Sequence, residues 1–271
     1  MQSLNLQLKK IELSEYRKRG AVESDFSRLI TESTEVYIDG RLAIVYVAPV
    51  QENLSVLREA LQEIKYSTST RTSGLQTTSR IFGYAPRNEL RNHPCRLVSL
   101  ATEFPKHHAT IENAAQIASK YYWLSNPDLA GSHMQMSEEK LEGQYVLAGT
   151  MFTSGIVNEN NPLQYHYDSG NYNGVYSAMF GFKQGVRGGY LSVPQLDVGF
   201  EIADSSLLLF DGQGLLHGVT PIKKLRKDAK RYSIVYYSLK QMWNCDTPGE
   251  ELERIRNRRT QIERKPRKVK S

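Results

Sequence analysis

A histidine and an aspartate stand two residues apart in the sequence, at His166 and Asp168. In an extended strand every second side chain points to the same side, so this imidazole and this carboxylate can bind one metal ion. A chain of this composition would contain roughly 0.2 such triplets by chance. The pair therefore indicates a metal site only if a third ligand accompanies it.

His217 is the candidate third ligand, 49 residues after Asp168. It follows the apolar run 207–210 and the glycine-rich turn 211–214, at the start of a predicted late strand. Two histidines and one carboxylate on one side of an iron ion leave three positions open, which oxygenases use for a cosubstrate and O₂. A structural zinc site usually has a closed tetrahedral ligand set, so these residues favour iron.

Arg231 adds specificity to this constellation, because it lies fourteen positions after His217 and opens a predicted strand. Its guanidinium can bind the distal carboxylate of 2-oxoglutarate through two hydrogen bonds, while the 2-oxo acid end binds the iron. Ser233 shares the same strand face and can donate its hydroxyl to that carboxylate.

The alternative to a metal site at these four positions is a core histidine beside a structural ion pair. For the other histidines a structural role of this kind is the first interpretation; they are His93, His107, His108 and His133.

The elements that must position these residues begin with a hairpin and two helices. Residues 36–48 predict two short strands around an Asp-Gly turn. Apolar residues at helical spacing predict amphipathic helices over Glu52 to Lys65 and Ile111 to Trp123. The Ser/Thr-rich stretch 67–79 is expected to be a loop, followed by a compact aromatic and basic segment at 80–87.

From Gly143 onward, short strand-like runs alternate with turn-forming residues, as in a sandwich or barrel. The runs are 145–152, 163–168, 175–182, 190–193, 199–202, 207–210, 218–221 and 231–239. This number of runs suits a double-sheet jelly roll. We therefore expect an α+β, mainly β fold, with a double-stranded β-helix (jelly-roll, cupin-like) core and supporting helices on one face.

The length of 271 residues allows one enlarged domain. We expect a single domain over 1–253, with a hairpin and helical support at 1–142 and the double-stranded β-helix core at 143–240. Residues 254–271 hold nine Lys or Arg and one acidic residue, a net charge of +8, which leaves −2 on residues 1–253. A charged helix over 248–259 is expected to run into a basic, disordered tail that can contact phosphates.

The sequence shows no apolar run of the ~20 residues that a membrane-spanning helix needs, and no secretory signal. We therefore expect a cytoplasmic protein, from a bacterium or a phage-infected cell, that is not secreted and has no membrane partner. Cys95 and Cys245 form neither a disulfide framework nor a paired zinc motif, so two buried or idle thiols are expected. No obligate protein partner is evident.

With these residues placed, the sequence resembles the TET/JBP family of Fe(II)- and 2-oxoglutarate-dependent dioxygenases, which oxidise the 5-methyl group of pyrimidines in nucleic acid. It is most similar to the small members found in phages and bacteria. One block that carries the resemblance is 79–87 with the following 95–100 segment. The other is 166–239, which contains the segments 188–194, 216–221 and 231–237.

The resemblance implies a role for each matching residue. His166, Asp168 and His217 match the iron ligands, Arg231 matches the arginine that binds 2-oxoglutarate, and Ser233 matches its helper. Asn171 matches a position that can hydrogen-bond a flipped base, and Tyr237 matches an aromatic position on which the base can stack. For Asn171 the alternative is turn chemistry in a segment rich in turn formers, and for Tyr237 it is a core tyrosine.

The implied cofactors are Fe(II), 2-oxoglutarate as cosubstrate, and O₂, and the implied partner is DNA with its target base flipped into the site. The implied reaction is hydroxylation of 5-methylcytosine to 5-hydroxymethylcytosine. Thymine is an alternative, because Leu239 stands where cytosine-oxidising members can place a histidine. A small-molecule or protein hydroxylase, a non-catalytic nucleic-acid binder and a cupin-like zinc hydrolase are the competing interpretations. The last of these leaves Arg231 without a role.

Overall fold

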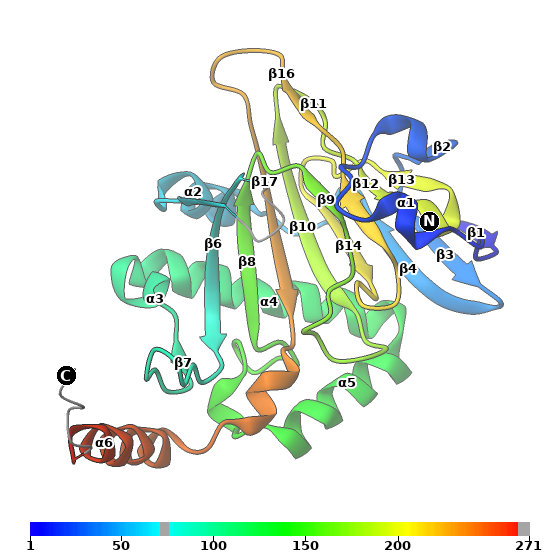
Figure 1. Ribbon diagram of the computed structural model, residues 1–271. Helices are drawn as coiled ribbons and strands as arrows, with labels where there is room; N and C mark the ends of the chain where they lie inside the picture. Colours follow the sequence, from blue (N-terminus) through cyan, green and yellow to red (C-terminus); the bar gives the residue numbers. More distant parts are fainter. Residues whose placement is uncertain (71–75, 265–271) are drawn as a thin grey trace, which may run out of the picture.

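Two β-sheets face each other in this protein, and helices cover the outer side of the larger one (Figure 1). The computed structural model describes residues 1–70 and 76–264. The larger sheet has the strand order β1-β3-β4-β14-β10-β17-β8-β6-β5, with β7 paired to β6. The smaller sheet has the order β2-β13-β12-β15-β9, and β11 and β16 form a separate two-stranded ribbon. This arrangement contains the mainly β, two-sheet core that the sequence predicts.

The strands of the larger sheet are β1 (Gln2–Leu6), β3 (Thr34–Ile38), β4 (Arg41–Val47), β5 (Ser67–Thr70), β6 (Gln76–Ala85), β7 (Arg96–Leu97), β8 (Ser154–Glu159), β10 (Ser177–Gln184), β14 (Ser206–Phe210) and β17 (Lys230–Tyr237). Those of the smaller sheet are β2 (Arg28–Ile30), β9 (Leu163–His166), β12 (Leu191–Val193), β13 (Val198–Phe200) and β15 (His217–Val219). The ribbon consists of β11 (Val186–Gly188) and β16 (Ile222–Lys224).

The larger sheet is buried on both faces, so its central strands are apolar on both sides. Along β14, Leu207 and Leu209 pack into the core under the helices, whereas Leu208 and Phe210 pack into the core between the sheets. This alternation follows from the two-residue period of a strand. It explains why the run 207–210 is continuously hydrophobic.

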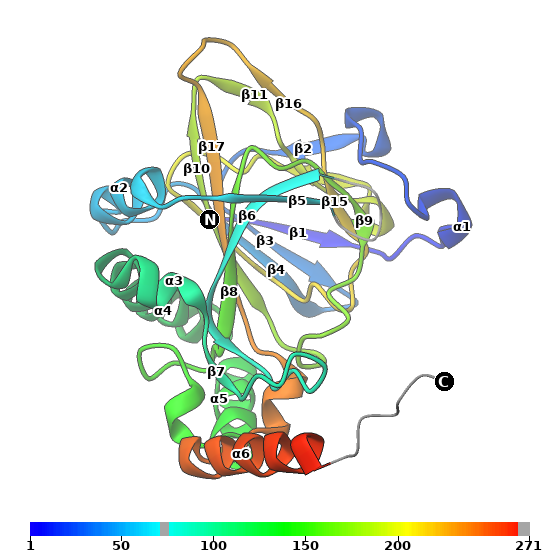
Figure 2. The same ribbon diagram turned by 60° about the vertical axis from the view of Figure 1, so that its left-hand side comes forward.

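Four helices brace the outer face of the larger sheet, as the two views show (Figures 1 and 2). They are α2 (Ser55–Glu63), α3 (Ser99–Glu103), α4 (Pro105–Ser125) and α5 (Pro127–Lys140). Buried residues of α2 and α4 share one apolar cluster with side chains of the sheet, including Phe82, Phe180 and Tyr236. The helices predicted at 52–65 and 111–123 are therefore present, and α4 is longer than predicted. The short α1 (Leu13–Tyr16) lies outside this layer.

Three expectations about the sheets need correction. The run 145–152 forms no strand. A 3₁₀ turn, Gly143–Tyr145, ends at its first residue, its backbone is left-handed at Ala148 and Gly149, and the strand β8 starts only at Ser154. The stretch 67–79 was expected to be a loop, yet its described parts belong to β5 and β6, where β-branched threonines suit a strand. The core is also not confined to 143–240, because strands from the first 100 residues join both sheets.

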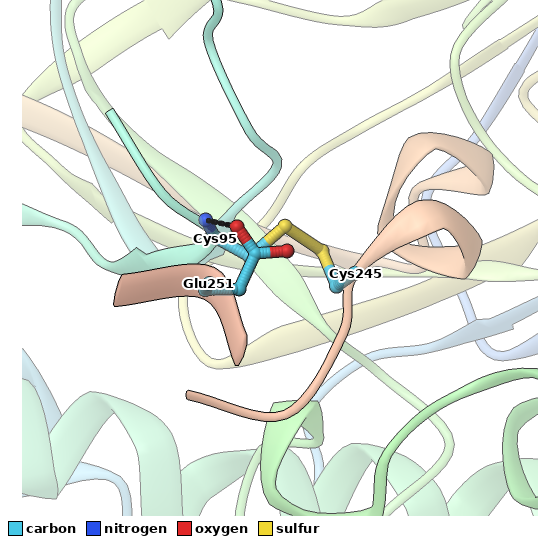
Figure 3. Close-up of side chains that lie close together, drawn as sticks. All are labelled: Cys95, Cys245 and Glu251. Carbon is cyan, nitrogen blue, oxygen red and sulfur yellow. Dashed lines mark hydrogen bonds between the residues drawn. A yellow bond between two sulfur atoms is a disulfide. The ribbon is translucent and has the colours of Figure 1, made fainter. Parts of the chain in front are cut away.

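The C-terminal segment is attached to the rest of the chain by a disulfide and a buried carboxylate (Figure 3). Cys95 and Cys245 are buried, as one of the two expectations had it, but they form a disulfide with their Cα atoms 5.8 Å apart and are therefore not thiols. The helix α6 (Pro248–Arg264) follows, so the predicted helix extends beyond residue 259 and the expected boundary at 253/254 falls inside it. Residues 265–271 of the predicted tail lie outside the described residues.

Glu251 of α6 is buried against this junction, with 1% of its surface exposed. Its carboxylate accepts hydrogen bonds from the backbone N–H of Cys95 at 3.1 Å and of Asp246 at 3.0 Å, and from Nε of Arg87 at 3.0 Å. Burial alone would raise the pKa of Glu251, but these hydrogen bonds together lower it by more than burial raises it. The net pKa of Glu251 therefore lies below its ordinary value.

Among the described residues, no helix is long and apolar enough to cross a membrane.

We expect Glu251→Gln to lower the free energy of unfolding by about 2 kcal/mol at neutral pH, because a charged hydrogen-bond acceptor beside Arg87 is lost. The lowered pKa means that the stabilisation is complete above the ordinary glutamate pKa and is lost as the pH falls through the folded-state value. Urea unfolding at neutral and acidic pH measures this. Glu253→Gln, on an exposed position of the same helix, is the control. A pH-independent difference between Glu251→Gln and the wild type would contradict this explanation.

Candidate metal centre

The candidate ligands come together because β9 and β15 pair antiparallel with His166 directly opposite His217. Paired residues on neighbouring strands point to the same face, so the two imidazoles lie side by side with ring centroids 4.4 Å apart. Asp168 follows β9 by two residues and turns its carboxylate toward both rings. Its Oδ1 lies 3.6 Å from Nε2 of His166 and 3.9 Å from Nε2 of His217.

The two histidines are held with the same nitrogen facing the carboxylate. Nδ1 of His166 donates to the carbonyl of Gln164 at 2.8 Å, and Nδ1 of His217 donates to the carbonyl of Leu215 at 2.9 Å. With the proton on Nδ1, each Nε2 presents a lone pair, which is the form of histidine that binds metals. Burial lowers the pKa of His217 to about 4, so this ring is neutral at physiological pH.

Asp168 is positioned by the turn after β14 and by Asn171. The backbone N–H of Asp168 donates to the carbonyl of Gly212 at 2.9 Å, and Nδ2 of Asn171 donates to Oδ2 at 3.4 Å. A Cβ atom at Gly212 would lie 2.3 Å from Oδ2 of Asp168, so only glycine leaves the carboxylate in place. Asp211 fixes the turn itself by accepting hydrogen bonds from the backbone N–H groups of Gln213 and Gly214, both at 3.0 Å.

A pocket of about 270 Å³ opens beside the three ligands, between the two sheets. Its apolar lining consists of Leu239 and of residues from both sheets, which are Ile156, Leu163, Met179, Leu191, Phe210, Val219 and Val235. Its polar residues are grouped on two sides. Asn158, Asn161 and Ser233 form one group, and Asn171, Tyr237 and the segment 169–170 form the other. A small, mostly apolar cavity with a few polar groups is typical of a site that binds an organic molecule.

Arg231 lies on the same face of β17 as Ser233, and only 1% of its surface is exposed. Its Nε and Nη2 have no hydrogen-bond partner among the described residues. Burial lowers its pKa to about 10, which still leaves the guanidinium charged at neutral pH. An unpaired buried cation is costly and calls for an anion. The two free donors of the guanidinium therefore fit a carboxylate such as that of 2-oxoglutarate.

The predicted base-contacting residues also lie at the pocket. Asn171 forms a β-bridge with Leu239, and Tyr237 ends β17, so all three border the same side of the cavity. The amide of Asn171 is partly occupied, because Nδ2 donates both to Asp168 and to Oγ of Ser177 at 3.2 Å. Asn171 thus supports a candidate metal ligand whether or not it also contacts a substrate.

Sequence reasoning missed the two pocket asparagines Asn158 and Asn161, because it placed a strand at 145–152 and none over β8. An Asn-Glu-Asn-Asn run just before the His-x-Asp strand was the available signal. The other histidines have structural partners. His93 contacts Arg96, His107 pairs with Glu63, His108 accepts from the backbone of Gly83, and His133 contacts Ser238.

A second group of potential ligands occurs among the described residues, formed by Cys95, Cys245 and Glu251. It is unsuited to a metal, because the two sulfur atoms are bonded to each other and the carboxylate already accepts hydrogen bonds from Arg87 and two backbone N–H groups. The cluster of His166, Asp168 and His217 is thus the better candidate metal centre.

A family model and several known proteins match much of this chain. The family model Tet_JBP, described as the oxygenase domain of the 2OGFeDO superfamily, matches residues 81–240. Relatives include the bifunctional helicase and thymine dioxygenase JBP2 of Leishmania braziliensis, 29% identical over 170 residues, or 60% of this chain and 15% of the relative. JBP2 of Trypanosoma brucei brucei is 25% identical over 171 residues, or 61% of this chain and 15% of the relative.

The fold also resembles that of a solved structure, described as NgTET1 in complex with 5mC DNA. The TM-score is 0.59 at 16% sequence identity, and the match covers 86% of this chain and 92% of that chain. At this identity the likeness concerns the fold. The match to JBP2 spans about 15% of the length of those relatives, so it compares one segment of a larger protein with this chain.

We expect Gly212→Ala to weaken metal binding by at least about tenfold, because the added methyl group would displace the carboxylate of Asp168. Titration calorimetry with Mn(II) under anaerobic conditions measures the affinity. Gly143→Ala is the matched control, since a Cβ atom there meets nothing within 4 Å. Equal affinity in both variants would contradict the role assigned to the turn at 211–214.

Proposed function

The chain belongs to the Tet_JBP family, the oxygenase domain of the 2OGFeDO superfamily, and from this premise we propose that it hydroxylates the 5-methyl group of a pyrimidine base in DNA. As a member of this superfamily it is a 2-oxoglutarate- and Fe(II)-dependent oxygenase. The observation that carries the proposal is the buried guanidinium of Arg231, two of whose nitrogens have no partner among the described residues, on the same face of β17 as Ser233, which lines the pocket beside the His-Asp-His cluster. A structural ion pair would not leave that guanidinium free.

His166, Asp168 and His217 would hold Fe(II) through their Nε2 and carboxylate atoms. Arg231 and Ser233 would bind the distal carboxylate of 2-oxoglutarate, which orients its 2-oxo acid end toward the metal. When bound, iron and cosubstrate supply the oxidation of a C–H bond by O₂, coupled to conversion of 2-oxoglutarate to succinate and CO₂. The protein itself binds and orients the reactants, and the apolar lining of the pocket limits the access of water to them.

The side of the pocket with Asn171, Tyr237 and Leu239 would receive the base. A methyl group inside a duplex is out of reach of a buried metal, so the nucleotide must leave the stack, at a cost of a few kcal/mol. Stacking on Tyr237 and contacts to the phosphates would offset that cost. Asn171 would offer its Oδ1 to the base, because its Nδ2 already donates to Asp168 and Ser177.

5-Methylcytosine is the first candidate base, with 5-hydroxymethylcytosine as the product. The structural likeness to a protein whose structure is described with 5mC DNA supports it. Thymine is the second candidate, and two observations favour it. Leu239 gives the base side an apolar rather than a hydrogen-bonding residue, and the sequence relatives are described as thymine dioxygenases.

The basic C-terminal residues would contact DNA phosphates, but with less than their full formal charge. Arg254 and Arg258 of α6 pair with Asp246 and Glu89, so part of the +8 of residues 254–271 is neutralised within the chain. The remaining cations would contribute binding that weakens as salt concentration rises.

The proposed reaction can be tested directly. The protein is loaded anaerobically with Fe(II) and 2-oxoglutarate and exposed to O₂ with oligonucleotides that contain 5-methylcytosine or only thymine, and the digested nucleosides are analysed by mass spectrometry. We expect a hydroxymethyl nucleoside from one of these oligonucleotides, and none with His217→Ala. Succinate release without any nucleoside change would contradict the proposed substrate and favour a protein or small molecule instead.

We expect Arg231→Met to abolish the thermal stabilisation that 2-oxoglutarate gives the Mn(II)-loaded wild type, because the carboxylate loses its cation. Without ligand, the variant should be as stable as the wild type or about 1 kcal/mol more stable, since an unpaired buried charge is removed. Thermal unfolding with and without 2-oxoglutarate measures both effects. Arg187→Met, at an exposed position, is the control. A destabilised variant that still responds to 2-oxoglutarate would contradict this assignment.

A further inference from the structure

A series of side-chain hydrogen bonds runs from β6 to the pocket through three buried polar residues. Asn161, Asn158 and Ser233 are only 3%, 4% and 4% exposed. Asn161 hydrogen-bonds both backbone groups of Thr78, at 2.7 and 2.9 Å. Its Nδ2 also donates to Oδ1 of Asn158 at 3.1 Å, and Nδ2 of Asn158 donates to Oγ of Ser233 at 3.4 Å.

The backbone of Thr78 fixes the direction of every hydrogen bond in this series. A backbone N–H can only donate, so the atom of Asn161 that faces it must be the amide oxygen. The other end of Asn161 is then Nδ2, which has two hydrogens, one for the carbonyl of Thr78 and one for Asn158. Asn158 must therefore present its oxygen to Asn161 and its Nδ2 to Ser233.

The same reasoning determines the role of the Ser233 hydroxyl in its hydrogen bond with Asn158. Because Oγ of Ser233 accepts a hydrogen from Asn158, its own hydrogen must point elsewhere. Asn158 and Ser233 are directly paired across β8 and β17, and both line the pocket. Ser233 also shares a strand face with Arg231, whose Nε and Nη2 have no partner in the part of the chain that the structure describes. The hydroxyl hydrogen is thus left for another acceptor, on the strand face that also carries Arg231.

We propose that Asn158 is a positioning residue for the cosubstrate, which keeps the hydroxyl of Ser233 as a hydrogen-bond donor to the distal carboxylate of 2-oxoglutarate. The inference rests on the proposed binding of that carboxylate at Arg231. Asn158 acts through Ser233 and does not need to touch the cosubstrate. Asn161 and the backbone of Thr78 set the orientation of Asn158. A backbone group of β6 therefore determines that Asn158 turns its Nδ2, and not its oxygen, toward Ser233.

Two substitutions at Asn158 separate this role from a general structural one. Asn158→Leu removes the amide donor at similar size and without charge. Asn158→Asp replaces the donor with an acceptor, so the hydroxyl of Ser233 would turn toward the new carboxylate and away from the cosubstrate. Each variant is made in the wild type, and Asn158→Leu is also made together with Ser233→Ala. Asn257→Leu, at an exposed position of α6, is the control for the substitution itself.

The measurement is anaerobic binding to the Fe(II)-loaded protein, followed by the visible absorption that a bound 2-oxo acid gives. Two ligands are compared: 2-oxoglutarate, and 2-oxobutyrate, which lacks the distal carboxylate. For 2-oxoglutarate we expect at least about tenfold weaker binding with Asn158→Asp and a smaller loss with Asn158→Leu, as for one hydrogen bond to a charged group. Binding of 2-oxobutyrate and of Fe(II) should stay within about twofold of the wild type.

The combined variant tests whether Asn158 acts through Ser233. We expect Asn158→Leu to cause no further loss of 2-oxoglutarate affinity once Ser233 is alanine, because the hydroxyl that it positions is gone. An equal loss in both backgrounds, or an equal loss for both 2-oxo acids, would overturn the inference. Unchanged 2-oxoglutarate binding in both single variants would overturn it too, while leaving the proposed function intact. A wild type that does not bind 2-oxoglutarate at all would instead overturn the assignment of Arg231 on which the inference rests.

Discussion

Strand β17 carries different chemistry on its two faces, and the rest of the molecule holds that strand in one register. Tyr232, Ile234 and Tyr236 pack into the core beneath the helices, whereas Ser233, Val235 and Tyr237 line the pocket. A slip of one residue would move Tyr232 and Tyr236 into the cavity and Arg231 into the core beneath the helices. The register is fixed from both sides, since β10 and β8 pair with β17 along nearly its whole length.

The free guanidinium of Arg231 makes that rigidity necessary. An unpaired buried cation destabilises the folded state, so packing elsewhere in the structure has to offset that cost. The braced outer face of the sheet provides that packing through one continuous apolar cluster that spans α2, α4 and the strands. Gly189 contributes locally, because a Cβ atom there would lie 2.8 Å from Cδ and Nε of Arg231. The site is thus prepared for an anion before any ligand arrives.

The sequence predicted which residues form the candidate metal centre better than it predicted the architecture that holds them. His166, Asp168, His217 and Arg231 follow from strand alternation and spacing, which are local properties, and the structure brings the first three together. The strand β8 was missed because the run 145–152 is more hydrophobic than Ser154–Glu159, although left-handed residues in that run prevent a strand. Pairings between distant segments, such as β4 with β14, leave no local signal.

The same limit applies to polar residues whose role depends on their neighbours. Asn158 and Asn161 look like turn formers in the sequence, and only the pairing of β8 with β6 and β17 gives them partners. Likewise, Cys95 and Cys245 lie 150 residues apart, so only the fold brings them together.

The two polar groups of the pocket impose different degrees of selectivity. At Arg231 and Ser233 a charged fork and an oriented hydroxyl would select a carboxylate strongly, since an uncharged group would leave the buried cation unpaired. At the other side, Asn171 has both amide hydrogens committed, so on the proposed assignment it offers an acceptor. Cytosine presents its 4-amino group and thymine its N3–H, and either can donate to that acceptor. Because Leu239 adds no hydrogen bond, discrimination between the two bases would depend on the shape of the pocket, which is worth less than a buried polar mismatch.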